Sequence, residues 1–381
     1  MRVLITNRRL ASRTGAELYV RDLAAALLER GHTPIVYSPL LGDVAREIRA
    51  TTVPVTSDLS AIAEPPDVIH GQHGPETLAA LLAFPGVPAV SVCHSWVGWA
   101  DAPVRFPRVR RYVAVDHTCR DRLCSERGIP PERVHVVLNS VDLARFRAGP
   151  PRPPRPRRAL VFSNAAGARG SHLDPIREAC AAEGIAVEVA GAASGRSLER
   201  PEEVLVEFDL VFAKAKAAIE AMAAGAAVVL CDAVGAGPMV TTAELGRLRA
   251  LNFGVRALRH PVTAPVLRRE IARYDADDAA AVSRTIRATA GRDAMVDELC
   301  ALYQAVIAEQ RDAGPGDPAD EMRAAAAYTQ WLSPRLYERD VLRALLLRPL
   351  RTPVVGAALR ALGRRAFGER AITFLRRLEE D

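Results

Sequence analysis

The sequence predicts an α/β protein of two domains, each a doubly wound parallel sheet layered with helices. Its 381 residues exceed the usual size of one compact domain and suit two. Short apolar runs alternate with helical patterns, and the alternation starts again after a stretch rich in proline and arginine. With 49% hydrophobic and 25% charged residues, the composition is that of a globular protein and excludes bulk disorder.

The first half begins with an apolar run at Arg2–Thr6 and a helical pattern through Glu17–His32. Gly31 is expected to end that helix, and Thr33–Pro39 is the next predicted strand. The apolar runs that follow are Pro66–Gly71, Val87–His94, Arg111–Asp116 and Val134–Asn139. Runs of this kind between helices indicate strands that are buried on both faces, which is typical of a parallel sheet.

The second half follows a stiff linker, Ala148–Arg158. Its apolar runs are Arg158–Asn164, Ile185–Gly191, Phe208–Ala213 and Ala226–Asp232. We expect the helix at Val296–Glu309 to close this half, and Gly314–Pro318 to break the chain before an arginine-rich helical extension. The predicted organisation is therefore 1–147, a linker at 148–158, a second domain at 159–312 and an extension at 313–381.

The net charge of +6 is concentrated at the end of the chain. Trp331–Asp381 holds eleven arginines against six acidic residues, so the rest is almost neutral and nucleic-acid binding has little support. Val341–Leu378 alternates arginine with apolar residues, which suits either an anionic membrane surface or a helix packed across the two domains. Six scattered cysteines and a first segment unlike a secretory signal indicate a cytoplasmic protein, at most peripheral to the inner face of the membrane.

Several enzyme classes lack their characteristic motifs here. The first strand is followed by a segment with one glycine, Gly15, and not by the glycine fingerprint of nicotinamide or flavin enzymes. A Walker-type phosphate loop, a hydrolase elbow and a metal-binding helix are also missing from the sequence.

Four motifs follow one another in a fixed order. They are the glycine loop and first helix at Thr14–His32, the strand ends at His70 and His94, the segment Gly128–Phe146 with Asn139 and Asp142, and Ile219–Asp232. In this order they resemble the GT-B glycosyltransferases of the retaining family 4 type. The resemblance covers the first 310 residues, roughly, and implies two Rossmann-like domains facing a central cleft. It implies transfer of a sugar from a nucleotide-diphosphate donor to an acceptor hydroxyl with retention, and neither a metal nor a cofactor.

The resemblance also assigns roles to individual residues. Glu220 matches the carboxylate that accepts hydrogen bonds from the donor ribose, and we place it at the start of its helix. His94 matches the histidine that touches the transferred sugar, and Gly15 would let backbone amides approach the donor phosphate. The implied partners are a nucleotide sugar and a glycan or lipid-linked acceptor.

This sequence departs from the family at three positions. Phe212 stands where the family has the first of two glutamates, and Glu220 is the second. Asn164 replaces an arginine and Arg169 replaces a lysine, so the donor diphosphate would lose one cation.

The lysine count suggests where that charge is restored. Only two of the 51 basic residues are lysines, Lys214 and Lys216, and both precede the Glu220 motif. A compact ammonium at a strand-to-helix junction can meet a diphosphate, although Lys216 could instead pair with Glu220 four residues on.

The remaining polar and aromatic residues have two interpretations each. His94 is either a sugar contact or a buried histidine with backbone partners, and His70 and His73 either contact the acceptor or lie on loop surface. Trp96 either forms an apolar platform on the acceptor side or packs in the core.

The sequence thus predicts a retaining glycosyltransferase, and two alternatives stay open. One is a catalytically silent GT-B module, suggested by Phe212 and Asn164. The other is a GT-B sugar-nucleotide epimerase, which would need no acceptor.

Overall fold

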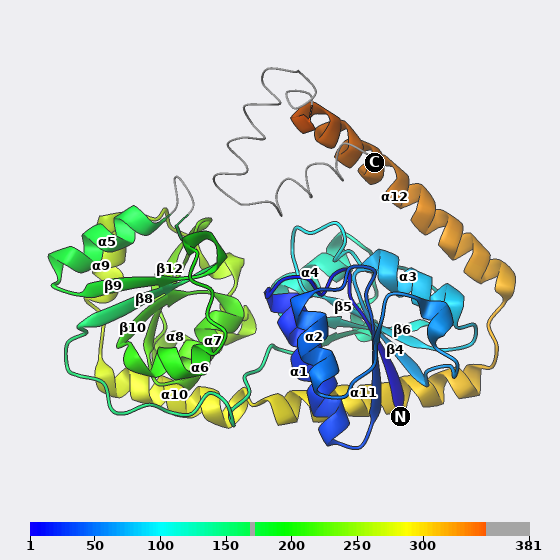
Figure 1. The fold of residues 1–381 in the computed structure, drawn as a ribbon, viewed down its shortest axis with the longest axis horizontal. Helices are drawn as coiled ribbons and strands as arrows, with labels where there is room; N and C mark the ends of the chain where they lie inside the picture. Colours follow the sequence, from blue (N-terminus) through cyan, green and yellow to red (C-terminus); the bar gives the residue numbers. More distant parts are fainter. Residues whose placement is uncertain (168–171, 348–381) are drawn as a thin grey trace. The chain divides into compact units, whose positions relative to one another are not determined.

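The computed structural model describes residues 1–167 and 172–347. The chain forms two compact units, Met1–Gly316 and Asp317–Asp381 (Figure 1). The first unit contains two separate sheets, each flanked by helices, and this confirms the predicted α/β fold.

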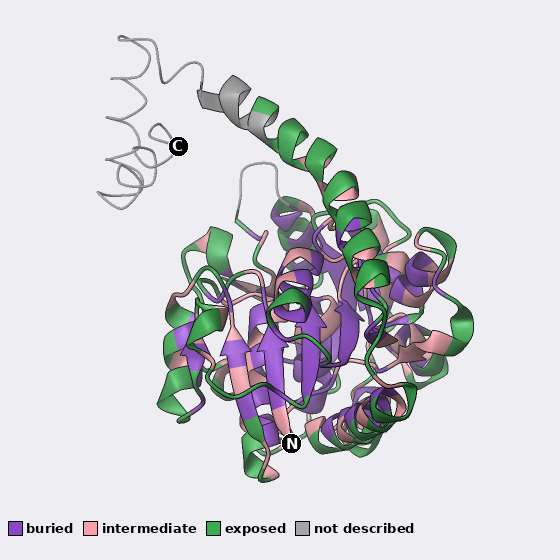
Figure 2. Cartoon of the chain, turned by 90° about the vertical axis from the view of Figure 1, so that its right-hand side faces the viewer, coloured by how far each residue is buried: buried purple, intermediate pink, exposed green. Residues whose placement is uncertain are grey.

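The first sheet has seven parallel strands in the order β3-β2-β1-β4-β5-β6-β7. The strands are β1 (Arg2–Thr6), β2 (Thr33–Tyr37), β3 (Val55–Thr56), β4 (Val68–Gln72), β5 (Ala89–Cys93), β6 (Val109–Ala114) and β7 (Val134–Val136). Strand order reverses between β1 and β4, the kind of position at which ligands bind in doubly wound sheets. Figure 2 shows the central strands buried along their length, while the helices beside them expose their outer faces.

The helices of this half connect successive strands. They are α1 (Gly15–Glu29), α2 (Asp43–Ala50), α3 (Gly74–Ala83) and α4 (His117–Ser125), with short 3₁₀ turns η1 (Leu59–Ala61) and η2 (Pro131–Arg133). Gly31 has a φ of +74°, so the predicted end of the first helix falls at a residue that adopts this backbone without strain.

The second sheet has five strands in the order β12-β11-β10-β8-β9, with β12 antiparallel to β11. The strands are β8 (Arg158–Phe162), β9 (Ala186–Ala190), β10 (Leu210–Ala213), β11 (Ala227–Asp232) and β12 (Gly235–Met239). Its helices and 3₁₀ turns are α5 (Leu173–Ala182), η3 (Ala192–Ser194), α6 (Pro201–Val204), η4 (Leu205–Glu207), α7 (Ala215–Ala223), α8 (Thr242–Ala250), η5 (Val255–Ala257), α9 (Ala264–Ile271) and α10 (Ala276–Thr289). The antiparallel edge strand was not predicted, because Gly235–Met239 lacks an apolar run.

One helix lies in a different place from the predicted one. We expected Val296–Glu309 to close the second half, but α11 (Arg292–Ala313) packs on α1, β4, β5 and β6 of the first half. Its inner face buries Leu299, Tyr303 and Val306. The local pattern predicts the helix, but which sheet it covers depends on the direction of the chain after α10.

The chain passes between the two sheets twice, and the two passages meet. The Val141 amide donates to the Ala290 carbonyl and the Arg292 amide donates to the Val141 carbonyl, both at 2.9 Å. The predicted linker is held by Arg152, whose guanidinium donates to the carbonyls of Val206, Ala224 and Gly225. Burial lowers the pKa of Arg152 below its usual range, but the three carbonyl acceptors satisfy its donors.

The second unit contains α12 (Pro318–Leu347). The side chains of the predicted membrane-facing segment that follow Val341 lie outside the described residues. Within residues 1–167 and 172–347, no helix is long and apolar enough to cross a bilayer.

The packing of α11 gives the first prediction. Leu299→Ala should lower the free energy of unfolding of the full chain by about 2–5 kcal/mol, because Leu299 is fully buried and the change leaves a cavity. Urea unfolding followed by circular dichroism measures this change.

The matched control is Leu82→Ala on α3, since the Leu82 side chain is half exposed. It should shift stability by no more than about 0.5 kcal/mol. Equal effects of the two substitutions would contradict the placement of α11 on the sheet.

Candidate active site

Three cavities meet at the start of α7, between the two halves of the first unit. The central cavity, of about 420 Å³, is lined by the beginning of α1, by α7 and by the ends of β8 and β11. The apolar-rimmed cavity, of about 470 Å³, lies between the loops that follow β5 and β11. The small cavity, of about 160 Å³, contains Tyr19, Asp22, His94 and Asn139. Ala215 lines all three, so the junction of β10 and α7 is the centre of the site.

The backbone at this junction is held in an uncommon conformation. Ala215 has a φ of +50°, and its amide donates to the Phe253 carbonyl at 2.9 Å. Asn252 and Phe253 also have positive φ values, so two left-handed segments face each other here. Left-handed backbone at residues other than glycine is costly and is concentrated at functional sites.

Positive side chains dominate the central cavity. The charged residues among its described lining are Arg13, Arg21, Arg145, Lys214 and Lys216 against Glu220 and Asp232. The first turns of α1 and α7 also line it, with Thr14, Gly15, Ala215 and Lys216. Helix amino termini carry free amides and partial positive charge, so the cavity suits an anion.

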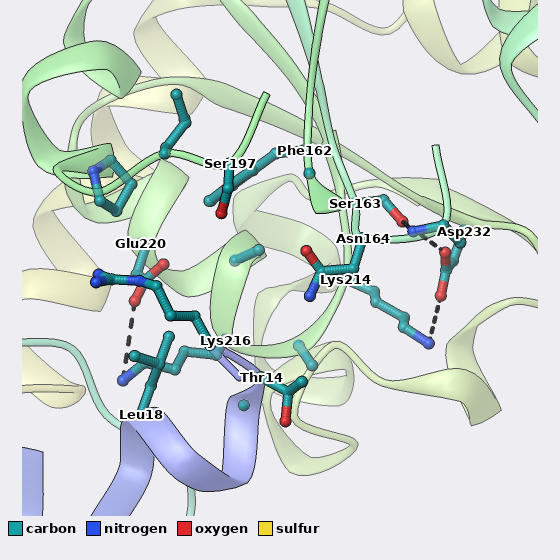
Figure 3. Close-up of a pocket in the computed structure, with 18 of the residues that line it drawn as sticks. Thr14, Leu18, Phe162, Ser163, Asn164, Ser197, Lys214, Lys216, Glu220 and Asp232 are labelled. Atoms are coloured by element: carbon teal, nitrogen blue, oxygen red, sulfur yellow. Dashed lines mark hydrogen bonds and ion pairs between the residues drawn. The ribbon is translucent and has the colours of Figure 1, made fainter. Parts of the chain in front are cut away.

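Lys214 and Lys216 enter two different ion-pair clusters (Figure 3). The Lys214 ammonium pairs with Asp232, and the Ser163 hydroxyl donates to the same carboxylate at 2.9 Å. Burial would raise the pKa of Asp232, but the Lys214 ammonium and the Ser163 hydroxyl bring it below its usual value. Asp232 was not predicted as a site residue, although its position at the end of an apolar run was a usable signal.

Lys216 connects the two halves of the unit. Its Nζ lies 2.8 Å from Asp22 Oδ2 on α1 and 3.8 Å from Glu220 Oε1 on α7. Burial would raise the pKa of Asp22, but Lys216 and Arg21 lower it to about 2. The predicted contact between Lys216 and Glu220 is present, and Asp22 is an additional partner that the sequence did not indicate.

Glu220 is buried in the middle of α7. The expectation that it opens the helix is wrong, because α7 begins five residues earlier, at Ala215. Figure 3 shows its carboxylate facing the Lys216 ammonium, close to Leu18 of α1. Burial raises the pKa of Glu220 to about 7, and the nearby Lys216 ammonium only partly offsets this effect.

The three positions that depart from the family differ in their surroundings. Phe212 lies in β10 and is fully buried in the core, so that position supplies no side chain to the central cavity. Asn164 lines the central cavity, but its Oδ1 accepts the Ala192 amide at 3.2 Å and so holds the loop after β9. Arg169 lies outside the described residues. Around Gly15, a Cβ would meet no atom within 4 Å, which leaves open space at the start of α1.

His94 and His70 belong to one buried aromatic stack. The Tyr19 ring packs edge-on against His94 at 4.8 Å and stacks on His70 at 5.9 Å. The Tyr303 hydroxyl lies 2.6 Å from His70 Nδ1. Burial lowers the pKa of both histidines to about 3, so both imidazoles are neutral at physiological pH.

Of the three predicted histidines, only His94 lines one of these three cavities, and it lines both the apolar-rimmed and the small one. His70 is fully buried in β4, so its assignment to loop surface is wrong. His73 precedes α3, accepts the Arg8 amide at 3.3 Å and lines none of the three cavities. Trp96 lines the apolar-rimmed cavity and lies under the Arg256 guanidinium.

Asp116 and Thr118 were missed by the sequence analysis. Asp116 ends an apolar run, caps α4 through the Cys119 amide at 2.7 Å, and lines the apolar-rimmed cavity with Thr118. Among residues 1–167 and 172–347, no group of three His, Cys, Asp or Glu side chains could hold a metal ion.

Two doubly wound domains that share a cleft at their strand ends define the GT-B class of protein. Residues 13–145 match the sequence profile of Glycosyltransferase Family 4. The chain therefore has the GT-B fold that its motifs predicted, and residues 13–145 are similar to glycosyltransferase family 4. No curated protein sequence matches it.

Solved structures support the same fold. A glycosyltransferase from Rickettsia africae ESF-5 is 13% identical with a TM-score of 0.59, over 80% of this chain and 98% of that one. Anabaena Alr3699/HepE, solved with UDP and glucose, is 14% identical with a TM-score of 0.57, over 80% and 100%. A putative UDP-N-acetylglucosamine 2-epimerase from Listeria monocytogenes is 12% identical with a TM-score of 0.51, over 81% and 97%. At identities this low, the structural similarity shows the fold alone.

The buried carboxyl group of Glu220 gives a prediction about how stability depends on pH. Its pKa rises from 4.5 to about 7 on folding, so the native chain retains a proton that the unfolded chain releases in this range. The contribution of Glu220 to stability is therefore most favourable below pH 4.5 and declines as the pH rises to 7. Glu220→Gln removes this decline and should gain about 1–3 kcal/mol relative to wild type between pH 5 and pH 8.

Urea unfolding at both pH values measures the difference. Glu132→Gln is the control, because Glu132 lies exposed in η2. A difference between wild type and Glu220→Gln that does not vary with pH would contradict the burial of a protonated carboxyl group.

Proposed function

We propose that this protein transfers a sugar from a nucleotide-diphosphate donor to an acceptor hydroxyl, with retention of configuration and without a metal or cofactor. The observation that carries the proposal is the convergence of two helix amino termini, two lysines and one buried glutamate on the central cavity. This combination provides separate positions for a diphosphate and for a ribose.

The diphosphate position lies at the start of α7. Backbone amides in the first turn of a helix have no partner within the helix and bind phosphate oxygens. Lys214 adjoins this turn, and its ammonium can leave Asp232 for a phosphate oxygen, because both anions compete for the same charge. In a closed cleft such a cation stabilises the charge that develops on the leaving group.

The ribose position lies on Glu220. Its carboxyl group is buried at the wall of the central cavity, where ribose hydroxyls could donate to it. Such hydrogen bonds favour the ionised form and would lower its pKa from about 7 on binding. Lys216 holds this carboxylate and Asp22 together, so nucleotide binding is coupled to the contact between the two halves.

The transfer step needs no protein nucleophile. The acceptor oxygen forms a bond to the anomeric carbon while the bond from that carbon to the phosphate oxygen breaks. The electron pair leaves with the nucleoside diphosphate, and the acceptor proton passes to the departing phosphate oxygen. Attack on the same face as departure retains the anomeric configuration, which proton NMR of the product would test.

A catalytically silent binding module is the second candidate. It is favoured by the pairing of both lysines with carboxylates and by the placement of Phe212 in the core. Nucleotide binding without donor hydrolysis or transfer would identify it. Conversion of the nucleotide sugar with no release of nucleotide would identify an epimerase instead.

Two variants test the donor site separately. Lys214→Met should weaken the binding of a nucleoside diphosphate by about 10- to 150-fold, the loss of a charged hydrogen bond, and leave nucleoside binding unchanged. Glu220→Gln should weaken both ligands. Calorimetric titration with UDP, ADP, GDP and dTDP and their nucleosides measures the affinities, after a thermal-shift screen has chosen the base.

Glu132→Gln again serves as the control and should bind like wild type. If every one of the four diphosphates fails to bind the wild-type chain, the proposed donor site is wrong. Equal losses of nucleoside and diphosphate affinity in Lys214→Met would reject the assignment of Lys214 to the phosphate.

Membrane attachment through the extension is part of the same proposal. Val341–Leu378 contains nine arginines and one acidic residue, so the full chain should sediment with phosphatidylglycerol vesicles at low salt. Binding should fall at 0.5 M NaCl, where charge screening is strong, and a chain ending at Gly316 should not bind. Vesicle binding that survives the truncation would assign attachment to another surface.

A further inference from the structure

The apolar-rimmed cavity lies directly beside the central cavity. The two share Lys214 and Ala215, so a ligand in one adjoins a ligand in the other. Its volume of about 470 Å³ is within the usual range for small-molecule pockets, roughly 300–1,000 Å³. The proposed donor fills the central cavity and leaves this second one without an assigned ligand.

The rim of this cavity collects exposed apolar side chains. Trp96, Val97, Val234 and Val255 expose 37%, 83%, 69% and 44% of their surface, and all four line the cavity. Only eleven large apolar residues are exposed in the part of the chain that the structure describes, and four of them gather around this one cavity. A gathered apolar rim indicates a binding surface, whereas single exposed apolar residues do not.

The floor of the cavity is polar and incompletely hydrogen-bonded. His94 Nε2 and Thr118 Oγ1 are both buried, and neither has a hydrogen-bond partner among the described residues. Asp116 joins them on the cavity wall. Buried polar atoms are normally satisfied, so these two suit hydrogen bonds to a ligand.

The buried floor and the exposed rim of the cavity therefore differ in chemistry. His94 also lines the small cavity together with Gly15 and Lys216 of the donor side. The polar floor thus adjoins the proposed donor site. A ligand that satisfies both ends has a hydroxyl at one end and an apolar body at the other.

We propose, building on the donor-site assignment above, that this cavity binds the acceptor as a soluble amphipathic alcohol or glycoside. Its hydroxyl end contacts His94 and Thr118, and its apolar body packs between Trp96 and Val97 on one side and Val234 and Val255 on the other. The two walls come from different halves of the unit. Arg256 bridges them, with an ion pair to Asp121 at 2.5 Å and its guanidinium 5.5 Å from the Trp96 ring.

Binding of octyl and methyl β-D-glucoside to the full chain tests the proposal. Calorimetric titration below the micelle concentration should give at least tenfold tighter binding of the octyl compound, because burying two methylene groups suffices for about that factor. In the double variant Val97→Ser/Val234→Ser the preference should fall below about threefold. The control Leu40→Ser/Leu82→Ser changes two exposed apolar residues that do not line this cavity, and it should keep the octyl preference.

Thr118→Val tests the polar floor. It keeps the side-chain shape, so the melting temperature should be unchanged, and the affinity for both glucosides should fall about threefold or more through the lost hydrogen bond. A binding loss with unchanged melting temperature would not follow from a merely structural role.

The outcomes separate this inference from the donor-site proposal. Nucleoside diphosphate affinity should be the same in the rim variant as in wild type, so a failure of donor binding does not affect the glucoside comparison. Equal binding of the two glucosides, or an octyl preference that the rim variant retains, overturns the inference. Binding of phosphatidylglycerol vesicles that the rim variant abolishes would identify a membrane surface and also overturn it.

Discussion

The ion pair between Lys216 and Asp22 is the contact on which the site depends. It joins α7 of one half to α1 of the other, 194 positions apart in sequence, and it places the Lys216 ammonium beside Glu220. A buried charge without a partner is strongly destabilising, so the two helices are fixed as a pair. The same contact sets the electrostatic environment of the only carboxylate of α7 that lines the central cavity.

Basic side chains of the central cavity already form ion pairs with protein carboxylates in the absence of a ligand. Lys214 is paired with Asp232, Arg145 with Glu202, and Arg13 with Glu47. On the proposal above, a diphosphate would exchange partners with protein carboxylates and would not meet isolated cations. Such an exchange would make specificity depend on geometry more than on net charge.

Local patterns in the sequence predicted the features that depend only on residues close together in the chain. Apolar runs predicted the strands, and the order of the motifs predicted the GT-B fold. The rarity of lysine, two of 51 basic residues, predicted that Lys214 and Lys216 belong to the site. The placement of α11, the burial of His70 and the core position of Phe212 depend on contacts between distant segments, which periodicity does not encode. Asp116 and Asp232 could have been found, because both end predicted strands where ligands of α/β proteins bind. Asp22 could not, since it lies on a helix face with no distinguishing pattern.

The return of α11 to the first sheet has a consequence for synthesis on the ribosome. The last strand of the first sheet ends at Val136, yet the helix that covers β4, β5 and β6 ends at Ala313. The surface of β4, β5 and β6 that α11 covers therefore stays exposed while the whole second half is translated, and the buried contacts of Leu299 and Tyr303 form only afterwards. Because α11 follows the second half in the sequence, the first half cannot complete its core before the second half has been synthesised.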